Sequence, residues 1–482
     1  MEIFESLTFV DLSILVTYLA LCVFLGIKAG GKPGDSKTYF RTSGDVPWWA
    51  ASFSIVATET SLLTVISIPA VAYGGSLVFL QLVFGYIVGR ILVAYFILPA
   101  YFKGELVTPY SLFQERFGTG FRRLTSGTFL LTRLLADGVR LFAAAIPLKI
   151  VTGLDYWVAI SIIAFLTLAY TYWGGLKSVI WIDVLQLAVY VLCAVFILSY
   201  IPQFISGSGV WSTLQEAGKL TIIQMPVSFS DIFLTPYNLI GAFIGGVFLT
   251  MASHGTDHLI VQRLLACGEL SKSRYALISS AIFVFFQFLL FLVVGLFIYV
   301  FYQGADIASL GLNTGDEIIM KFVAEEMPIG TTGLFVAALF AAAMSTLSSS
   351  LSALSSSTIF DLFPNLSKRS DALKISRIAM VVWTFIFILF ASAFTDTQNP
   401  VVELGLGIAG FTYGALLGAF ITGIYTNHKT VSASVALIVC VFSMTIIIFY
   451  AGLAWPWYTL IGFLIYMGTT TLIETINRIV GK

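Results

Sequence analysis

Long apolar segments run through this chain from one end to the other, and their length limits what it can fold into. A helix needs about 20 consecutive apolar residues to cross the hydrocarbon layer of a membrane, and the sequence meets that requirement many times. Of its 482 residues, 58% are hydrophobic and 10% are charged, whereas soluble domains carry roughly 25% charged residues. This pattern excludes a soluble globular enzyme and predicts an all-α polytopic membrane protein.

Thirteen apolar segments, separated by charged or helix-breaking stretches, are the expected transmembrane helices. They fall at 8–28, 47–72, 76–101, 123–150, 155–173, 179–205, 233–264, 273–303, 328–361, 372–395, 399–425, 430–451 and 454–475. An odd number of crossings places the two ends of the chain on opposite sides of the membrane.

The basic residues indicate which side is cytoplasmic. Loops after odd-numbered helices, together with the C-terminal tail, hold 19 lysines and arginines, whereas the opposite loops hold 3. Cytoplasmic loops carry such an excess, so we expect the N-terminus outside and the C-terminus in the cytoplasm. The net charge of zero provides no field that would attract nucleic acid, and we expect no nucleic-acid partner.

The cysteines predict neither a disulfide framework nor a metal site. They stand singly in apolar segments, without paired spacing, and are read as small buried hydrophobic residues. The four positions are Cys22, Cys193, Cys267 and Cys440.

The second expected helix, SFSIVATETSLLTVISIPAVAYGG, carries a polar run in its middle that contains Thr58, Glu59 and Thr60. A carboxylate near the centre of a bilayer is costly unless it is paired or solvated, so it marks a functional site by default. The alternative is that a neighbouring arginine holds Glu59 for structural reasons alone. The polar run favours a broken helix whose freed carbonyls bind a cation.

The ninth expected helix is unusually rich in hydroxyl groups. Ser345, Ser348, Ser349 and Ser352 are spaced by three or four residues, so they share one helical face. Oxygen ligands suit a hard cation such as sodium better than a transition metal. The alternative is that small residues allow close helix packing while each hydroxyl bonds to its own backbone.

Charged residues in three other expected helices also call for an explanation. Asp183 opens the sixth helix, where its carboxylate needs water or a cation, or else stabilises the helix N-terminus as an anion. Arg140, three residues from Asp137 on a neighbouring face, either grips a substrate carboxylate or neutralises Asp137 or Glu59. We expect Arg90 to reach toward the cytoplasmic interface.

His254 and His258 have the i, i+4 spacing of a zinc site, with Asp257 between them. The alternative interpretation is two ordinary histidines near the cytoplasmic end of the seventh helix. A third ligand would have to converge on them before zinc could bind.

Three stretches together resemble the sodium:solute symporter family, whose members transport sugars, proline, sialic acid, iodide and monocarboxylates. They are GGLKSVIWIDVLQ, AAAMSTLSSSLSALSSSTIFDLF, and GTDHLIVQR at 255–263, which is similar to the family's GxDQxxVQR stretch. The resemblance implies a LeuT-like core of two inverted five-helix repeats within one transmembrane transporter domain. Its parts would be a first helix and loop at 1–46, repeats at 47–206 and 207–427, and two C-terminal helices at 428–482.

The resemblance also implies ion sites. The principal sodium site would use the backbone carbonyls of Ala57, Thr60 and Ala342 with the hydroxyls of Ser345 and Thr346. A second sodium site, present in some members, would use Asp183, Ser345, Ser348 and Ser349.

Family members line the solute site from the second and third helices. The corresponding residues here are Glu59, Ser61, Thr64, Phe79 and Gln81, to which we add Arg140. The sugar and sialic-acid transporters carry Gln or Glu where this chain has Val83, which argues against a simple transfer of their substrates. In the proline transporters an Asp tied to sodium binding stands at the position of Glu59, so this residue serves either the ion or the solute.

The sequence therefore predicts a sodium-coupled symporter that imports a small organic solute, with a carboxylate or a zwitterion favoured, by alternating access. It is not expected to be an enzyme, and sodium is its coupling ion rather than a cofactor. We expect it in the plasma (inner) membrane, surrounded by lipid, as a monomer or weak oligomer. The alternatives are a proton-coupled symporter, a channel, or an intramembrane metalloenzyme built on His254, Asp257 and His258.

Overall fold

The chain is all-helical in the parts that the structure describes. The computed structural model describes residues 8–104, 106–203, 209–393 and 401–480, and these ranges contain no β-strand. The helices are α1 (Phe9–Gly30), α2 (Ser36–Arg41), α3 (Trp48–Glu59), α4 (Leu62–Gly74), α5 (Leu80–Leu92), α6 (Leu98–Tyr101), α7 (Leu112–Thr152), α8 (Tyr156–Tyr200), α9 (Val210–Glu216), α10 (Asp231–Leu234), α11 (Leu239–Gly255), α12 (His258–Leu265), α13 (Leu270–Phe301), α14 (Ile318–Glu326), α15 (Thr331–Ser357), α16 (Ala372–Ser392), α17 (Val401–Tyr425), α18 (Thr430–Tyr450) and α19 (Tyr458–Val480).

The membrane-length helices confirm a polytopic membrane protein but not the number of crossings. Among the described residues, nine helices are long and apolar enough to span a membrane, or up to eleven if each of two bent pairs counts as one span. The expected helices at 155–173 and 179–205 are joined in α8, which kinks at Gly175 (φ 59°). The expected helix at 123–150 lies inside α7, whose kink is at Gly118, and α7 carries several charged side chains that lower its hydropathy.

The two bent pairs are the main irregularities of the helix bundle. Helices α3 and α4 meet at 69° across Thr60 and Ser61, and α11 and α12 meet at 60° across Thr256 and Asp257. The first break agrees with the polar run in the sequence. The second was not expected, because the segment at 233–264 reads as one apolar helix.

Gly175 allows α8 to pass close to the short helix α2. Its positive φ is in a region that favours glycine, and a Cβ there would lie 2.3 Å from the carbonyl oxygen of Tyr39. The hydroxyl of Tyr39 in turn donates to the carbonyls of Thr171 and Tyr172, at 3.0 and 2.9 Å. The kink and α2 therefore fit together only with glycine at this position.

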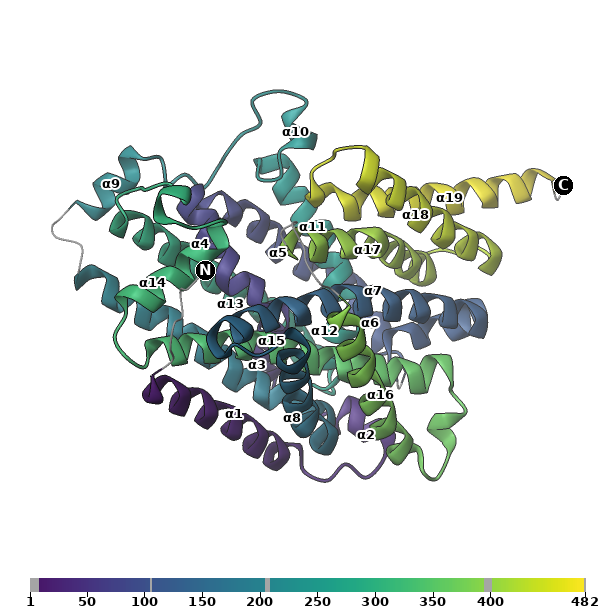
Figure 1. Cartoon of the computed structure of the whole chain (residues 1–482). Helices are drawn as coiled ribbons and strands as arrows, with labels where there is room; N and C mark the ends of the chain where they lie inside the picture. Colours follow the sequence, from purple (N-terminus) through teal and green to yellow (C-terminus); the bar gives the residue numbers. More distant parts are fainter. Residues whose placement is uncertain (1–7, 105, 204–208, 394–400, 481–482) are drawn as a thin grey trace.

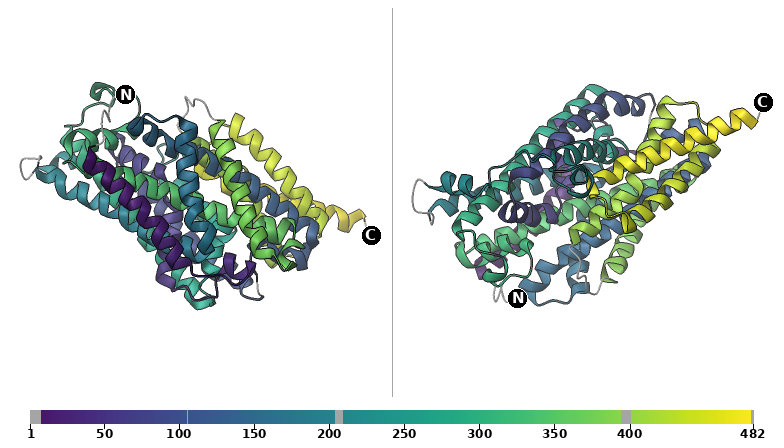
Figure 2. Two further views of the ribbon diagram at one scale, coloured as in Figure 1. Left: turned by 60° about the horizontal axis from the view of Figure 1, so that its bottom comes forward. Right: turned by 90° about the horizontal axis from the view of Figure 1, so that it is seen from above.

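Helix α15 lies in the middle of the bundle, and the other helices surround it (Figures 1 and 2). It packs against α8, α1, α7 and α3. The C-terminal helices α17, α18 and α19 form a layer on one side, and α1 lies at the opposite edge (Figure 1). Apolar side chains such as Phe24, Leu389 and Phe442 are exposed on the outer helices, as expected for a surface that faces lipid.

Candidate functional site

The break between α3 and α4 places free backbone groups in the middle of a span. Thr60 (φ −74°, ψ 103°) and Ser61 (φ −90°, ψ 168°) leave the helical conformation. The N–H of Thr60 still donates to the Val56 carbonyl at 2.9 Å, but within the described residues no backbone N–H donates to the carbonyl of Ala57. Such a carbonyl is available to a cation.

Helix α15 presents its hydroxyl face to this region. The hydroxyls of Ser348 and Ser349 donate to the carbonyl of Ser345 at 3.0 and 2.7 Å, and the hydroxyl of Thr346 donates to the carbonyl of Ala342 at 3.2 Å. These bonds are those expected of small residues packed in a helix. They do not exclude an ion, because a hydroxyl that donates its proton keeps lone pairs free to accept or ligate.

Asp183 is fully buried at the centre of a polar cluster. Its carboxylate accepts from the hydroxyl of Ser345 at 2.7 Å, from the hydroxyl of Ser54 at 2.5 Å and from Nη2 of Arg263 at 2.8 Å. It lies eight residues beyond the kink at Gly175, inside α8. The interpretation of Asp183 as an anion in the first turn of a helix is therefore wrong, since the chain is already helical well before it.

Arg263 contacts two of the four residues expected to bind the second sodium ion, Asp183 and Ser349. Besides Asp183, its guanidinium donates to the hydroxyl of Ser54 at 2.6 Å and to the hydroxyl of Ser349 at 2.5 Å. Sequence reasoning missed both Arg263 and Ser54 as members of this cluster. The only signal was that Arg263 ends the motif GTDHLIVQR, which follows an otherwise apolar span.

Glu59 is held by an arginine. The guanidinium of Arg90, on α5, forms an ion pair with its carboxylate, and Nε2 of His254 lies 3.7 Å from the same oxygen. Arg90 also donates to the hydroxyl of Ser280 at 2.6 Å and is fully buried. The expectation that Arg90 reaches the cytoplasmic interface is therefore wrong, because its buried guanidinium pairs with the Glu59 carboxylate instead.

The histidines and Asp257 do not converge on one point. Asp257 caps the N-terminus of α12 by accepting from the N–H of Leu259 at 2.9 Å, and its carboxylate pairs with Arg133. The ring of His258 instead faces the ring of Phe129. Among the described residues no three His, Cys, Asp or Glu side chains are grouped as they would be around a metal ion.

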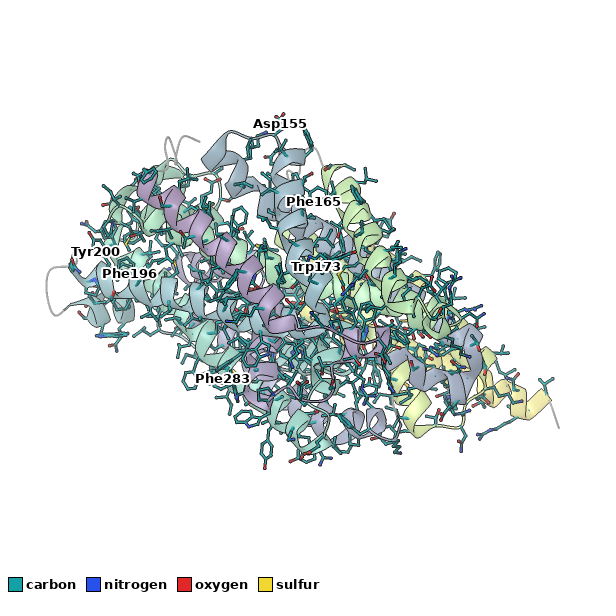
Figure 3. All side chains as sticks on the ribbon, turned by 90° about the horizontal axis from the view of Figure 1, so that it is seen from below. Asp155, Phe165, Trp173, Phe196, Tyr200 and Phe283 are labelled. Atoms are coloured by element: carbon teal, nitrogen blue, oxygen red, sulfur yellow. The ribbon has the colours of Figure 1, made fainter. Side chains whose placement is uncertain are left out.

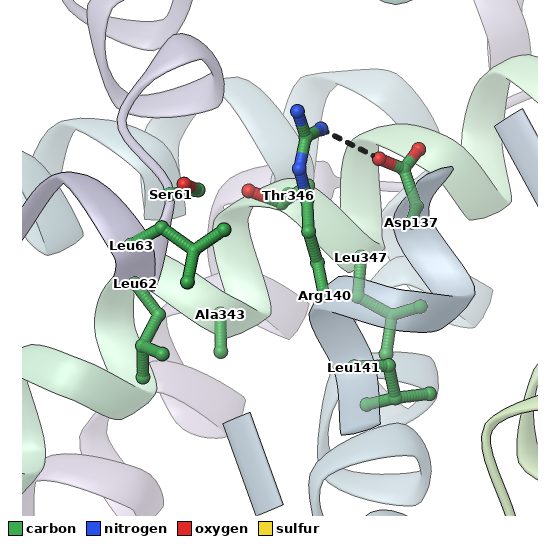
Figure 4. A pocket seen from close by; sticks show the side chains of 9 residues that line it. All are labelled: Ser61, Leu62, Leu63, Asp137, Arg140, Leu141, Ala343, Thr346 and Leu347. Carbon is green, nitrogen blue, oxygen red and sulfur yellow. Dashed lines mark hydrogen bonds and ion pairs between the residues drawn. The ribbon is translucent and has the colours of Figure 1, made fainter. Parts of the chain in front are cut away.

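A small cavity of about 10 Å³ lies where α4, α7 and α15 meet (Figure 4). The side chain of Arg140 runs past Thr346, and its Nη1 donates to Asp137 at 2.8 Å. The cavity is lined by Ser61, Leu62, Leu63, Asp137, Arg140, Leu141, Ala343, Thr346 and Leu347. Of the predicted solute-site residues, the structure thus brings together Ser61 and Arg140.

The other predicted solute-site residues lie elsewhere. The amide of Gln81 donates to the carbonyls of Val78 and Tyr237 at 3.1 and 2.9 Å, and its oxygen accepts from the N–H of Gln224 at 3.0 Å. This side chain holds the segment before α11, and both N–H groups of its amide are used in doing so. Phe79 packs on Phe288 with ring centroids 5.0 Å apart. Neither Thr64 nor Glu59 lines the cavity.

Comparison with known proteins identifies the family. The model of the sodium:solute symporter family matches residues 39–442. The chain belongs to this family. It is 30% identical over 465 residues to the sodium/sialic acid symporter SiaT of Proteus mirabilis, covering 94% of this chain and 92% of that protein. It is also 29% identical over 426 residues to the sodium-coupled monocarboxylate transporter 2 of Danio rerio, covering 84% of this chain and 66% of that one.

A solved structure agrees with this assignment. The substrate-bound, outward-open state of a Na⁺-coupled sialic acid symporter superimposes with a TM-score of 0.85 and 29% sequence identity, over 97% of this chain and 98% of that one. This member of the sodium:solute symporter family is therefore a multi-pass membrane protein and a sodium-coupled transporter of a small solute. The channel, proton-coupled and metalloenzyme alternatives are set aside, because the family consists of sodium-coupled secondary transporters.

Proposed function

We propose that this symporter imports a small carboxylate, which Arg140 binds in the cavity between α4, α7 and α15. The observation that supports the proposal is the incomplete hydrogen bonding of the Arg140 guanidinium. Its Nη1 is bonded to Asp137, while its Nε is buried without a partner. An unsatisfied buried donor is costly, and a carboxylate satisfies a guanidinium through two parallel bonds.

The relatives support a carboxylate as well. Sialic acid and monocarboxylates, which appear in the names of two relatives, share a carboxylate group, although Val83 departs from the sialic-acid pattern. A volume of about 10 Å³ holds about one water molecule. Loading a solute therefore requires α4, α7 and α15 to separate, which is the movement that alternating access demands.

We propose that the principal sodium site lies beside this cavity, with the carbonyls of Ala57, Thr60 and Ala342 and the hydroxyls of Ser345 and Thr346 as ligands. The free carbonyl of Ala57 and the oxygen-rich face of α15 support it. Thr346 also lines the cavity. One residue would thus serve both ion and solute, so that binding of either favours the same conformation.

The second sodium site is proposed to be closed in this conformation. Asp183, Ser345, Ser348 and Ser349 are its ligands, but the guanidinium of Arg263 already neutralises Asp183 and bonds to Ser349. Two cations so close to one carboxylate repel each other. A second sodium ion would bind only where Arg263 moves away, so the arrangement described here carries one ion.

The membrane topology is a further part of the proposal. Counting α7 once, and α8 as two spans separated at Gly175, gives thirteen crossings together with the other spans and bent pairs. Helices from 47–206 and 207–427 would form the two inverted, LeuT-like repeats, after the first helix in 1–46 and before the last two in 428–482. The bias of basic residues places the N-terminus outside and the C-terminus in the cytoplasm of a plasma (inner) membrane protein that is monomeric or weakly oligomeric.

A thermal-shift screen of the purified protein in detergent tests the substrate class. Carboxylates, amino acids, sugars and small anions are compared in sodium and in choline buffer, because a bound solute stabilises the native state by mass action. We expect stabilisation by a carboxylate in sodium only, and its loss in Arg140→Gln. A sugar without a carboxylate that stabilises wild type and Arg140→Gln equally would contradict the proposal.

A further inference from the structure

A groove of about 360 Å³ opens on the outer surface between α3, α8 and α13, away from the solute cavity. Apolar side chains line it, among them Val56 from α3, Val184 and Leu187 from α8, and Phe283 from α13. Phe283 is labelled in Figure 3, where α13 lies at the rim of the bundle. Ala188 and Phe286 are exposed at its mouth, so the groove is open to the hydrocarbon of the membrane.

Among the described residues that line this groove, Gln287 is the one with a polar side chain. It lies near the middle of the 32-residue α13 and is only 4% exposed. Its Nε2 donates to the hydroxyl of Thr60 at 2.6 Å, whereas its Oε1 has no hydrogen-bond partner. A buried amide oxygen without a partner is uncommon and calls for an explanation.

The orientation of the Gln287 amide follows from Thr60. The hydroxyl of Thr60 donates its single proton to the carbonyl of Val56 at 2.8 Å. It can therefore only accept from Gln287, so the NH₂ group faces Thr60 and Oε1 is the free atom. What the groove lacks is a hydrogen-bond donor.

We propose that this groove binds a hydrophobic alcohol or phenol dissolved in the membrane, whose O–H donates to Oε1 of Gln287. Water is scarce at the centre of the bilayer, where unsatisfied polar groups are most costly. The head group of an ordinary lipid stays at the interface and does not reach the depth of Gln287. A molecule that is mostly hydrocarbon, with one hydroxyl, matches both the apolar walls and the single acceptor.

Two tryptophans near the groove provide a direct readout. The ring of Trp49 lies 6.1 Å from that of Phe53, which lines the groove, and 5.5 Å from that of Trp181. Bromine quenches tryptophan fluorescence on contact. The protein in lipid nanodiscs is therefore titrated with 4-(8-bromooctyl)phenol and, separately, with its methyl ether, which keeps the oxygen but has no O–H to donate.

We expect saturable quenching by the phenol and at least tenfold weaker binding of the ether. Ala188→Phe, at the mouth of the groove, should abolish saturable quenching, whereas Leu192→Phe, a residue of α8 that is 62% exposed and does not line the groove, should leave it unchanged. Equal binding of phenol and ether would overturn the role of Gln287. Saturable quenching that survives Ala188→Phe, or that is absent from wild type, would overturn the site itself. Because the phenol and the ether are compared on the wild-type protein, this test does not depend on the stability of a variant or on the identity of the transported solute.

Discussion

The guanidinium of Arg263 on α12 lies 2.8 Å from the carboxylate of Asp183 on α8, although 80 residues separate them in the sequence. Both side chains are fully buried, and the hydroxyls that surround them are those proposed for a second sodium ion. An internal cation thus lies against two of the residues proposed to bind that ion. The pair holds α8, α12 and α15 together for as long as it is intact.

Arg263→Met should uncover that second site. Removal of one partner leaves a buried carboxylate unpaired, which typically costs about 3–5 kcal/mol, so the melting temperature in choline buffer should fall. Sodium should raise the melting temperature of the variant by more than that of wild type, since the ion can now neutralise Asp183. The double variant Arg263→Met/Asp183→Asn should lose this extra effect of sodium. An unchanged response to sodium in the single variant would contradict the second site.

Ser345→Ala should weaken sodium activation of uptake. Loss of one ligand, at about 1 kcal/mol for an ordinary bond and up to about 3 kcal/mol for one to a charge, predicts a rise in the half-saturating sodium concentration of roughly 5- to 150-fold. This half-saturating concentration is measured from solute uptake into proteoliposomes at a series of sodium concentrations. Ser355→Ala is the matched control, because Ser355 is buried on the same helix and its hydroxyl has no partner. If both variants respond alike, Ser345 is not a ligand.

Arg140→Gln should raise the KM for a carboxylate solute. A hydrogen bond to a charged group is worth about 1.5–3 kcal/mol, which corresponds to roughly 10- to 100-fold in KM. Sodium binding in the absence of solute should persist. Arg140→Lys should recover only part of the loss, because lysine cannot form the two-bond pair. A KM within twofold of wild type in Arg140→Gln would show that the arginine only neutralises Asp137. The control for loss of a positive charge is Arg369→Gln, at an exposed position on the surface.

Glu59→Gln separates a structural role from a solute role. Because Arg90 is fully buried and pairs with Glu59, the variant leaves an unpaired guanidinium and should lose about 3 kcal/mol of stability or more. The KM for solute should change little at a temperature where the variant is folded. Glu59→Gln/Arg90→Leu should recover stability, since a buried ion pair can be replaced by neutral groups. A large rise in KM without loss of stability would instead assign Glu59 to the solute.

Patterns local in sequence predicted much of the fold and part of the site. The polar run around Thr60 predicted the first broken span. The three-residue spacing of Asp137 and Arg140 made their contact one of the alternatives, and the structure shows it at 2.8 Å. The break at Thr256 and Asp257 was missed because two polar residues in a long apolar run are a weak signal. The hydroxyl face of α15 was read correctly, since helical spacing alone defines it.

Contacts between distant segments were beyond sequence reasoning. No local sequence pattern predicts the ion pair of Arg90 with Glu59 or that of Arg263 with Asp183. Both pairs are determined by how the helices pack. The partners of Gln81 could not be foreseen for the same reason, since the backbone groups of Tyr237 and Gln224 that bond to its amide come from a later segment. A buried charge in a membrane-spanning helix predicts that a partner exists, but only the packed helix bundle shows which residue it is.

The ion pairs inside the described bundle have a consequence for energetics. They join equal numbers of carboxylates and arginines: Glu59, Asp137, Asp183, Asp257 and Asp361 with Arg90, Arg122, Arg133, Arg140 and Arg263. These side chains return to the same places in each complete transport cycle, so the net current of the cycle reports the charge that the ions and the solute carry. One sodium with one monovalent carboxylate is electroneutral and indifferent to membrane potential. With a second sodium ion the cycle becomes electrogenic, and the driving force for transport gains about 2.3 kcal/mol per 100 mV. A measurement of transport current therefore distinguishes one sodium ion from two.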